Sequence, residues 1–128
     1  MIHIVNFAHP LTDEQIEKIK ELASKADAIQ VINVKVQLDH EADFQEQIRS
    51  FVNAVGLNST QWQNECIVVN LPSLAVVAAG ILAELHGRMG YFPPVIRMRP
   101  IAGTIPLKFE VAEIVLLQSI RENSRKCR

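Results

Sequence analysis

The chain has 128 residues, 48% of them apolar, with a mean hydropathy of +0.12, 13 basic against 14 acidic side chains and two cysteines. A chain of this length and apolar content can bury one core without metal or disulfide crosslinks, so we expect one domain over residues 1–128. This composition excludes the disordered, collagen-like and cysteine-framework classes.

The sequence predicts neither a membrane span nor a signal peptide. The longest apolar run, residues 74–83, is too short to cross a bilayer. Residues 1–6 lack the basic region and the small-residue cleavage site of a signal peptide, which predicts a cytoplasmic protein without a membrane partner. Cys66 and Cys127 form no CxxC pattern and are expected to be free thiols.

Charge is polarised along the chain. Residues 1–66 carry five basic and ten acidic side chains, whereas residues 67–128 carry eight basic and four acidic ones. A basic second half suits an anionic ligand, and the acidic first half disfavours duplex DNA as a partner. Acidic surface helices followed by a basic tail would give the same distribution.

The first half of the chain alternates strand and helix patterns. Residues 2–7 form an apolar, β-branched run typical of a buried strand, and Thr12 with Gln15 gives the capping-box signature of a helix. Residues 28–37 alternate as a second strand. A second helix is then expected over residues 43–56, capped by Asp43 and ended by Gly56.

The second half begins with a short helical turn near Trp62 and an apolar strand over residues 67–70. Ser73 is expected to cap a helix over residues 74–86, with Gly87 at its end. Because residues 75–83 have no polar face, this helix must be covered on more than one side, either by a second layer of this chain or by a partner subunit. In so small a domain we favour a dimer interface.

The last elements are a strand over residues 91–99, a long loop and a segment over 109–117 whose apolar positions fit either strand or helix. We predict a strand there, followed by a helix over residues 118–126. On such a strand Glu110 and Glu113 would face opposite sides and make a poor acid/base pair.

This order of elements predicts an α/β, Rossmann-like fold: an open, mostly parallel five-stranded sheet with helices on both faces. With the strand order 2-1-3-4-5, ligands bind beyond the carboxyl ends of the first and third strands. The loops at that point are residues 6–12 and 70–73.

Polar groups follow both strands at this edge. Asn6 and Asn70 each end an apolar run, and an asparagine amide suits a nucleobase edge or a ribose. After Pro72, the free N–H groups around Ser73 and Leu74 suit a phosphate. The alternative, that the asparagines tie strand ends together and Ser73 only caps a helix, has about equal weight.

Two arginines and one histidine complete the candidate site. Arg97 and Arg99 share one face of their strand and are plausible phosphate ligands. His9 is the only candidate for proton transfer, although a loop histidine without a chemical role is commoner. The sequence has no GxGxxG, no P-loop and no metal-ligand spacing of histidines, so we expect neither a cofactor nor a metal. His3 is interpreted as a core residue.

Five segments together resemble the small CRISPR-associated Csx-fifteen family, and the resemblance covers essentially the whole chain. They are Val5 to Thr12, Asn70 to Leu74, Ala83 to Pro93, Arg97 to Pro100 and Phe109 to Ile114.

The resemblance implies a CARF-like domain that accompanies type III CRISPR systems and binds a cyclic oligoadenylate across the two-fold axis of a homodimer. Because no effector domain follows, the implied role is sequestration of the messenger, most simply cyclic tetra-adenylate. The resemblance leaves open whether the dimers assemble further once ligand is bound. Two alternatives remain: a metal-independent ring nuclease using the same pocket, and a non-catalytic protein-interaction subunit.

Overall fold

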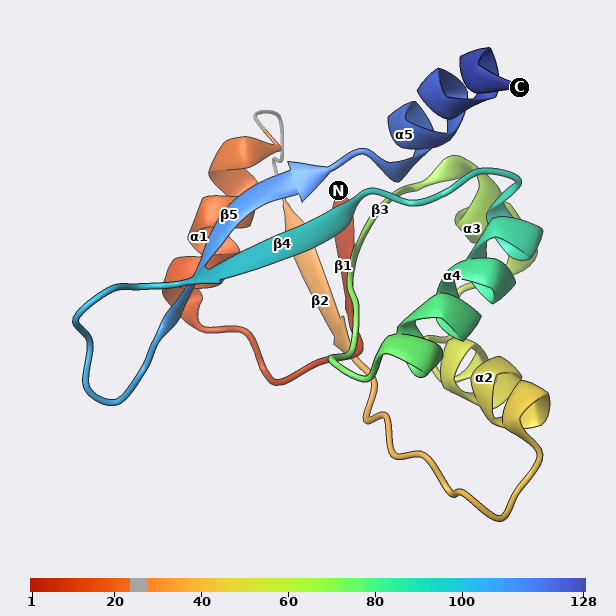
Figure 1. Cartoon of the computed structure of the whole chain (residues 1–128), viewed down its shortest axis with the longest axis horizontal. Helices are drawn as coiled ribbons and strands as arrows, with labels where there is room; N and C mark the ends of the chain where they lie inside the picture. The colour runs from red at the N-terminus through yellow and green to blue at the C-terminus, as the bar shows by residue number, and fades with distance from the viewer. Residues whose placement is uncertain (24–27) are drawn as a thin grey trace.

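The computed structural model describes residues 1–23 and 28–128 and has an α/β, Rossmann-like fold (Figure 1). Five strands form one sheet in the order β2-β1-β3-β4-β5, as predicted. The elements in chain order are β1 (Ile2–Asn6), α1 (Asp13–Leu22), β2 (Ile29–Asn33), α2 (Phe44–Asn53), α3 (Ser59–Asn64), β3 (Cys66–Asn70), α4 (Ala75–Met89), β4 (Val95–Pro100), β5 (Phe109–Val115), α5 (Leu117–Ser124) and the 3₁₀ turn η1 (Arg125–Cys127).

The sheet is parallel except at one edge. β1 lies between β2 and β3 in parallel register, β3 pairs in parallel with β4, and β4 pairs antiparallel with β5. The segment whose pattern fits either strand or helix is therefore a strand followed by a helix, as predicted. An antiparallel edge strand on an otherwise parallel sheet is common in α/β folds.

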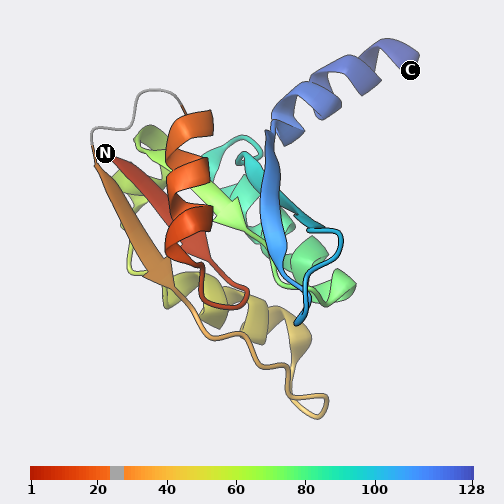
Figure 2. The same ribbon diagram turned by 90° about the vertical axis from the view of Figure 1, so that its left-hand side faces the viewer.

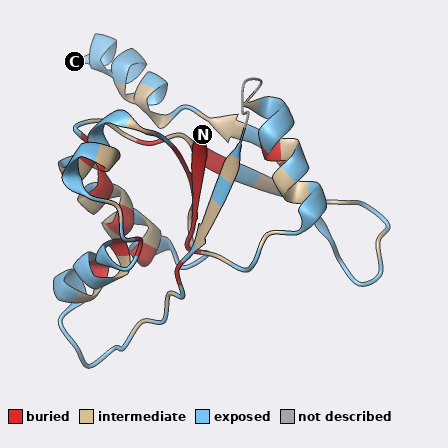
Figure 3. Cartoon of the chain, turned by 180° about the vertical axis from the view of Figure 1, so that it is seen from behind, coloured by how far each residue is buried: buried red, intermediate tan, exposed pale blue. Residues whose placement is uncertain are grey.

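Helices cover both faces of the sheet (Figure 2). On one face α1 packs through Ile19 onto a core that includes Ile4, Val68 and Val111. The larger core on the other face lies under α2, α3 and α4. Figure 3 shows that the buried residues concentrate in β1, β3 and the inner side of α4.

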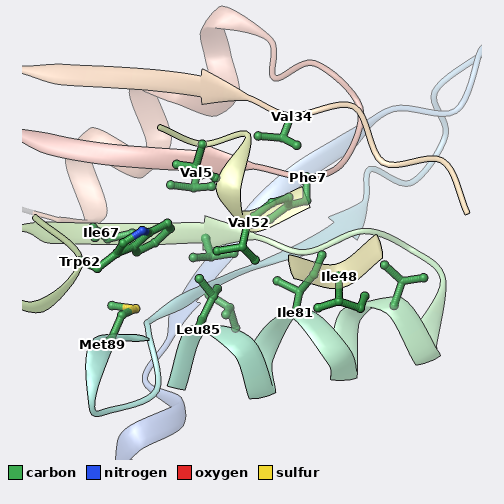
Figure 4. Close-up of a cluster of buried hydrophobic side chains, with 14 residues drawn as sticks. Val5, Phe7, Val34, Ile48, Val52, Trp62, Ile67, Ile81, Leu85 and Met89 are labelled. Atoms are coloured by element: carbon green, nitrogen blue, oxygen red, sulfur yellow. The ribbon is translucent and has the colours of Figure 1, made fainter. Parts of the chain in front are cut away.

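The larger core encloses the only tryptophan of the chain. Trp62, in the short helix α3, is 2% exposed and lies beside Ile67 (Figure 4). Its indole nitrogen is buried and has no hydrogen-bond partner among the described residues. The predicted helical turn at this tryptophan is confirmed, and its role is to fill the space between α4 and the sheet.

Two expected helix boundaries at α4 are wrong. The N-cap residue is Leu74, which has no side chain able to bond the first turn, rather than Ser73. The helix runs through Gly87 and ends at Met89, because Gly90 takes the left-handed conformation (φ 84°) that closes a helix, whereas a Cβ at Gly87 would meet nothing within 4 Å. Gly87 is thus an ordinary helix position.

Three other elements are clearly shorter than expected. β4 begins at Val95 instead of at Tyr91. β2 ends at Asn33 instead of reaching Gln37, and α2 ends at Asn53 rather than at Gly56. The N-terminal caps of α1 and α2 are as predicted. Thr12 and Gln15 form a capping box at α1, and Asp43 accepts the N–H of Glu46 at the start of α2.

Candidate functional site

Three asparagines end the three adjacent parallel strands at one level of the sheet. Asn6 is in register with Asn33 on one side and with Asn70 on the other. The Asn70 amide nitrogen donates to Asn6 Oδ1 at 3.0 Å, and the Asn6 amide nitrogen donates to Asn33 Oδ1 at 3.0 Å. We call Asn33, Asn6 and Asn70 the asparagine row.

Asn6 is the centre of this row and is fully buried. Its Oδ1 also accepts the N–H of Ala8 at 3.0 Å, and its Nδ2 also donates to the carbonyl of His9 at 2.9 Å. Every polar atom of this side chain is therefore used within the fold. All contacts of Asn6 are therefore explained by its interpretation as a tie between the strand ends and the following loop.

His9 lies next to the asparagine row, in the loop between β1 and α1. Its carbonyl is held by Asn6, while its imidazole is exposed, and none of the described residues hydrogen-bonds to that ring. A general base is normally oriented by a partner on its second nitrogen. The loop thus presents the imidazole at the carboxyl edge of the sheet without fixing its direction.

The start of α4 is exposed at this edge. Pro72 is half-buried, and the four residues from Ser73 to Val76 are exposed. No side chain caps the helix at Leu74. Because the first N–H groups of a helix have no intrahelical acceptor and carry the positive end of its dipole, this turn presents free donors to solvent. Such a turn can bind an anion.

Arg97 and Arg99 lie beyond the end of β3. Val95 at the start of β4 pairs with Val69, the penultimate residue of β3, so the two arginines extend past the carboxyl edge of the sheet. Val95 belongs to the core under α4, whereas Ile96 and Met98 pack on the α1 side. Alternation along the strand therefore places both arginines on the α4 side.

Each arginine is held by a glutamate of β5. Arg97 bonds Glu113 through Nε at 2.9 Å and Nη2 at 2.7 Å, and Arg99 Nε bonds Glu110 at 2.9 Å. The expectation that the two glutamates face opposite sides is wrong. The register shifts between Arg97 and Met98, so one extra residue of β5 bulges out and both glutamates point to the arginine side.

These ion pairs leave donors free for a ligand. The side chains of Arg97 and Arg99 are 51% and 56% exposed, and only part of each guanidinium is engaged. The uncapped first turn of α4 and the two arginines are on the same side of the sheet and at the same edge. Each of these groups can bind a phosphate, although in Figure 1 the carboxyl half of β4 runs toward α1 and away from the start of α4.

Two residues contribute to this site in ways that the sequence pattern does not predict. The sequence pattern places Asn33 inside a longer strand, whereas β2 ends at this residue. Asn33 follows an apolar run, as Asn6 and Asn70 do. This repetition at three strand ends is the signal that could have identified Asn33. Gln15 is predicted only as a cap residue, yet its Nε2 also donates to the Phe109 carbonyl at 2.9 Å.

The opposite edge of the sheet holds His3, which is buried as predicted. Its Nδ1 is 2.9 Å from Gln30 Oε1, and its Nε2 pairs with the Glu65 carboxylate. These bonds tie β1 to β2 and to the start of β3. Arg88, near the end of α4, pairs with Glu84 and donates to Asn53, so it links α4 to α2 rather than facing the site.

The remaining chemistry-bearing groups are dispersed. Cys66 and Cys127 are free and exposed. Across residues 1–23 and 28–128 no three His, Cys, Asp or Glu side chains gather as a metal site would require. Among the helices described, none has the length and apolarity needed to cross a membrane.

The strand order and connections define the class of this protein as an open α/β, Rossmann-like fold. In comparisons with known proteins no family model matches this chain, and no curated protein and no solved structure matches it.

Proposed function

We propose that this protein binds a cyclic oligoadenylate, most simply cyclic tetra-adenylate, at the carboxyl edge of its sheet and sequesters it as a homodimer in type III CRISPR signalling. One observation carries the chemical part of the proposal: the exposed first turn of α4 has no side-chain cap and shares its edge and face with Arg97 and Arg99. The class of ligand comes from the resemblance found along the sequence.

A cyclic oligoadenylate suits the hydrogen-bond donors of the α4 start and of the two arginines. It is a ring of phosphodiesters, and free helix-start amides with partly engaged guanidinium groups suit such phosphates. Two copies of the chain would present this set twice to one ring.

Sequestration is favoured over cleavage by the state of His9. Cleavage without a metal needs a positioned base near a ribose hydroxyl. The imidazole of His9 has no hydrogen-bond partner among the described residues to orient it. We therefore assign binding as the function and treat ring opening as an outcome that the experiment distinguishes.

The test uses labelled cyclic tri-, tetra- and hexa-adenylate, with gel shift for retention and chromatography of the label after long incubation. Retention of one intact ring is expected. Linear products would replace sequestration with ring-nuclease activity, and their loss in His9→Ala would assign the base to that histidine. No retention of any ring overturns the proposal.

Two variants locate the site. Ala75→Pro removes one N–H at the first helix position, where proline is tolerated, so the fold should persist while affinity falls about tenfold. Arg97→Gln should cause a similar loss. Lys108→Gln, an exposed basic residue in the loop between β4 and β5, is the matched control and should leave affinity within about twofold.

A further inference from the structure

The last helix of the chain has no buried residue. α5 projects from the body (Figures 1 and 2), attached by Leu117, which packs against the larger core, and by Gln118, which accepts the Phe92 N–H at 2.9 Å. An isolated helix this short is marginal in water, so most of its stability must come from packing. We call residues 116–128 the arm.

The arm is amphipathic and basic. Leu116 and Ile120 are each 58% exposed and lie one turn apart on the same side of the helix. The rest of the arm carries four basic side chains, Arg121, Arg125, Lys126 and Arg128, against the single acidic Glu122. Such a helix suits a partner surface that is apolar in the middle and acidic around it.

The chain carries a surface of that kind at the start of α2. Four acidic side chains occur between residues 39 and 46 without any Lys or Arg, and we call them the acidic rim: Asp39, Glu41, Asp43 and Glu46. The Gln47 side chain holds this segment against the first turn of α2, because it accepts the Asp39 N–H and donates to the Asp39 carbonyl. Residues 37–41 also line an open hollow of about 640 Å³.

Exposed apolar side chains lie beside the acidic rim. Phe44 is 36% exposed and lies against Gly80 of α4, where an added Cβ would be 3.1 Å from its ring. Val76, 54% exposed, is one turn before Gly80 on the same side of α4. Phe44 and Val76 thus form an apolar floor next to the acidic rim.

The arm cannot reach this surface in its own chain, because in Figures 1 and 2 α5 and the start of α2 lie at opposite ends of the molecule. We propose that the arm of one copy docks on the apolar floor and acidic rim of a second copy. Leu116 and Ile120 would cover Phe44 and Val76, while the arm's basic side chains meet the rim. Two reciprocal contacts of this kind form the dimer.

This inference specifies the surface of the homodimer in the proposed function, and its test leaves the nucleotide out. Sedimentation velocity over roughly 1 to 100 µM protein, a range that detects dimers with micromolar dissociation constants, should show association of the 14.4 kDa chain. Ile120→Glu, which removes no intrachain core contact, should weaken association at least about tenfold. If the chain binds the nucleotide but stays monomeric, the arm contact alone is overturned. If the chain associates but binds no nucleotide, the proposed function alone is overturned.

A charge exchange makes the test specific. An arm variant (Arg121→Glu, Arg125→Glu, Lys126→Glu) and a rim variant (Asp39→Lys, Glu41→Lys, Glu46→Lys) should each be monomeric, and their mixture should associate. Circular dichroism checks that both remain folded, and Lys108→Glu serves as the control that still associates.

Three results overturn the arm contact: persistent self-association of either variant, a mixture that stays monomeric, or a wild-type chain that stays monomeric at the highest concentration. A monomeric wild-type chain that sediments with phosphatidylserine vesicles would assign the arm to a lipid surface instead.

Discussion

The side-chain amide of Asn70 donates to the side-chain oxygen of Asn6 at 3.0 Å, and this bond joins the ends of β3 and β1. The same oxygen accepts the N–H of Ala8. A leucine at position 6 would fill a similar volume but leave both donors unpaired, the Asn70 amide in a buried space and the Ala8 N–H in a partly buried one. An unsatisfied buried polar group costs about 1–3 kcal/mol.

Asn6→Leu should therefore lower the free energy of unfolding by at least about 3 kcal/mol. Urea unfolding measures this, with the fluorescence of the buried Trp62 as the signal. Asn33→Leu is the control: Asn33 is exposed, and without it the Asn6 amide still donates to His9, so the loss should stay below about 1 kcal/mol. Equal losses would contradict a central role for Asn6.

Because α4 has no side-chain cap, adding one should raise the stability of the protein and lower its affinity for the ligand. Leu74→Asp supplies an N-cap acceptor and a negative charge at the helix start, which should raise stability by about 1 kcal/mol. The same carboxylate occupies the free amides and repels a phosphate, so affinity for the retained cyclic adenylate should fall. Leu74→Ala should do neither. A stabilised variant with unchanged affinity would place the phosphates elsewhere.

The glutamates of β5 compete with a ligand for the arginines. Glu110→Gln and Glu113→Gln each remove a negative charge beside a guanidinium, so affinity for the cyclic adenylate should rise several-fold, more at low salt. Both ion pairs are exposed, and stability should change by less than about 1 kcal/mol. Glu17→Gln on α1 is the control. Weaker binding would mean that the glutamates chiefly orient the arginines.

Two glycines of α4 should respond differently to alanine. At Gly87 a Cβ meets nothing within 4 Å, so Gly87→Ala should stabilise the helix by about 0.5–1 kcal/mol. At Gly80 the Cβ would lie 3.0 Å from buried Ile48, so crowding between α2 and α4 should cancel that gain. The measurement is the thermal unfolding midpoint of the two variants. A larger increase for Gly80→Ala than for Gly87→Ala would contradict this packing.

The strand order is predictable because its signals are local. The buried runs at residues 2–7 and 67–70 are apolar and β-branched, and the Thr12 capping box separates a strand from a helix without reference to the rest of the chain. Right-handed crossovers then leave few arrangements. The structure confirms the order and the late switch from strand to helix after Val115.

The details of the site depend on contacts that local patterns do not contain. The direction of Glu110 and Glu113 is set by a bulge that arises only when β5 pairs with β4. The burial of Asn6 depends on asparagines 27 and 64 residues away in sequence. The end of α4 is predicted wrongly because Gly87 and Gly90 are both reasonable stop signals, and only Gly90 takes a positive φ.

Gln15 uses its side chain in two directions at once. Its Oε1 accepts the Thr12 N–H at the start of α1, and its Nε2 donates to the carbonyl of Phe109 at the start of β5. The loop that carries His9 and the hairpin that carries the arginines are thereby linked through one side chain. Local opening of either segment breaks a bond of the other, so their amide protons should exchange with solvent as one cooperative unit.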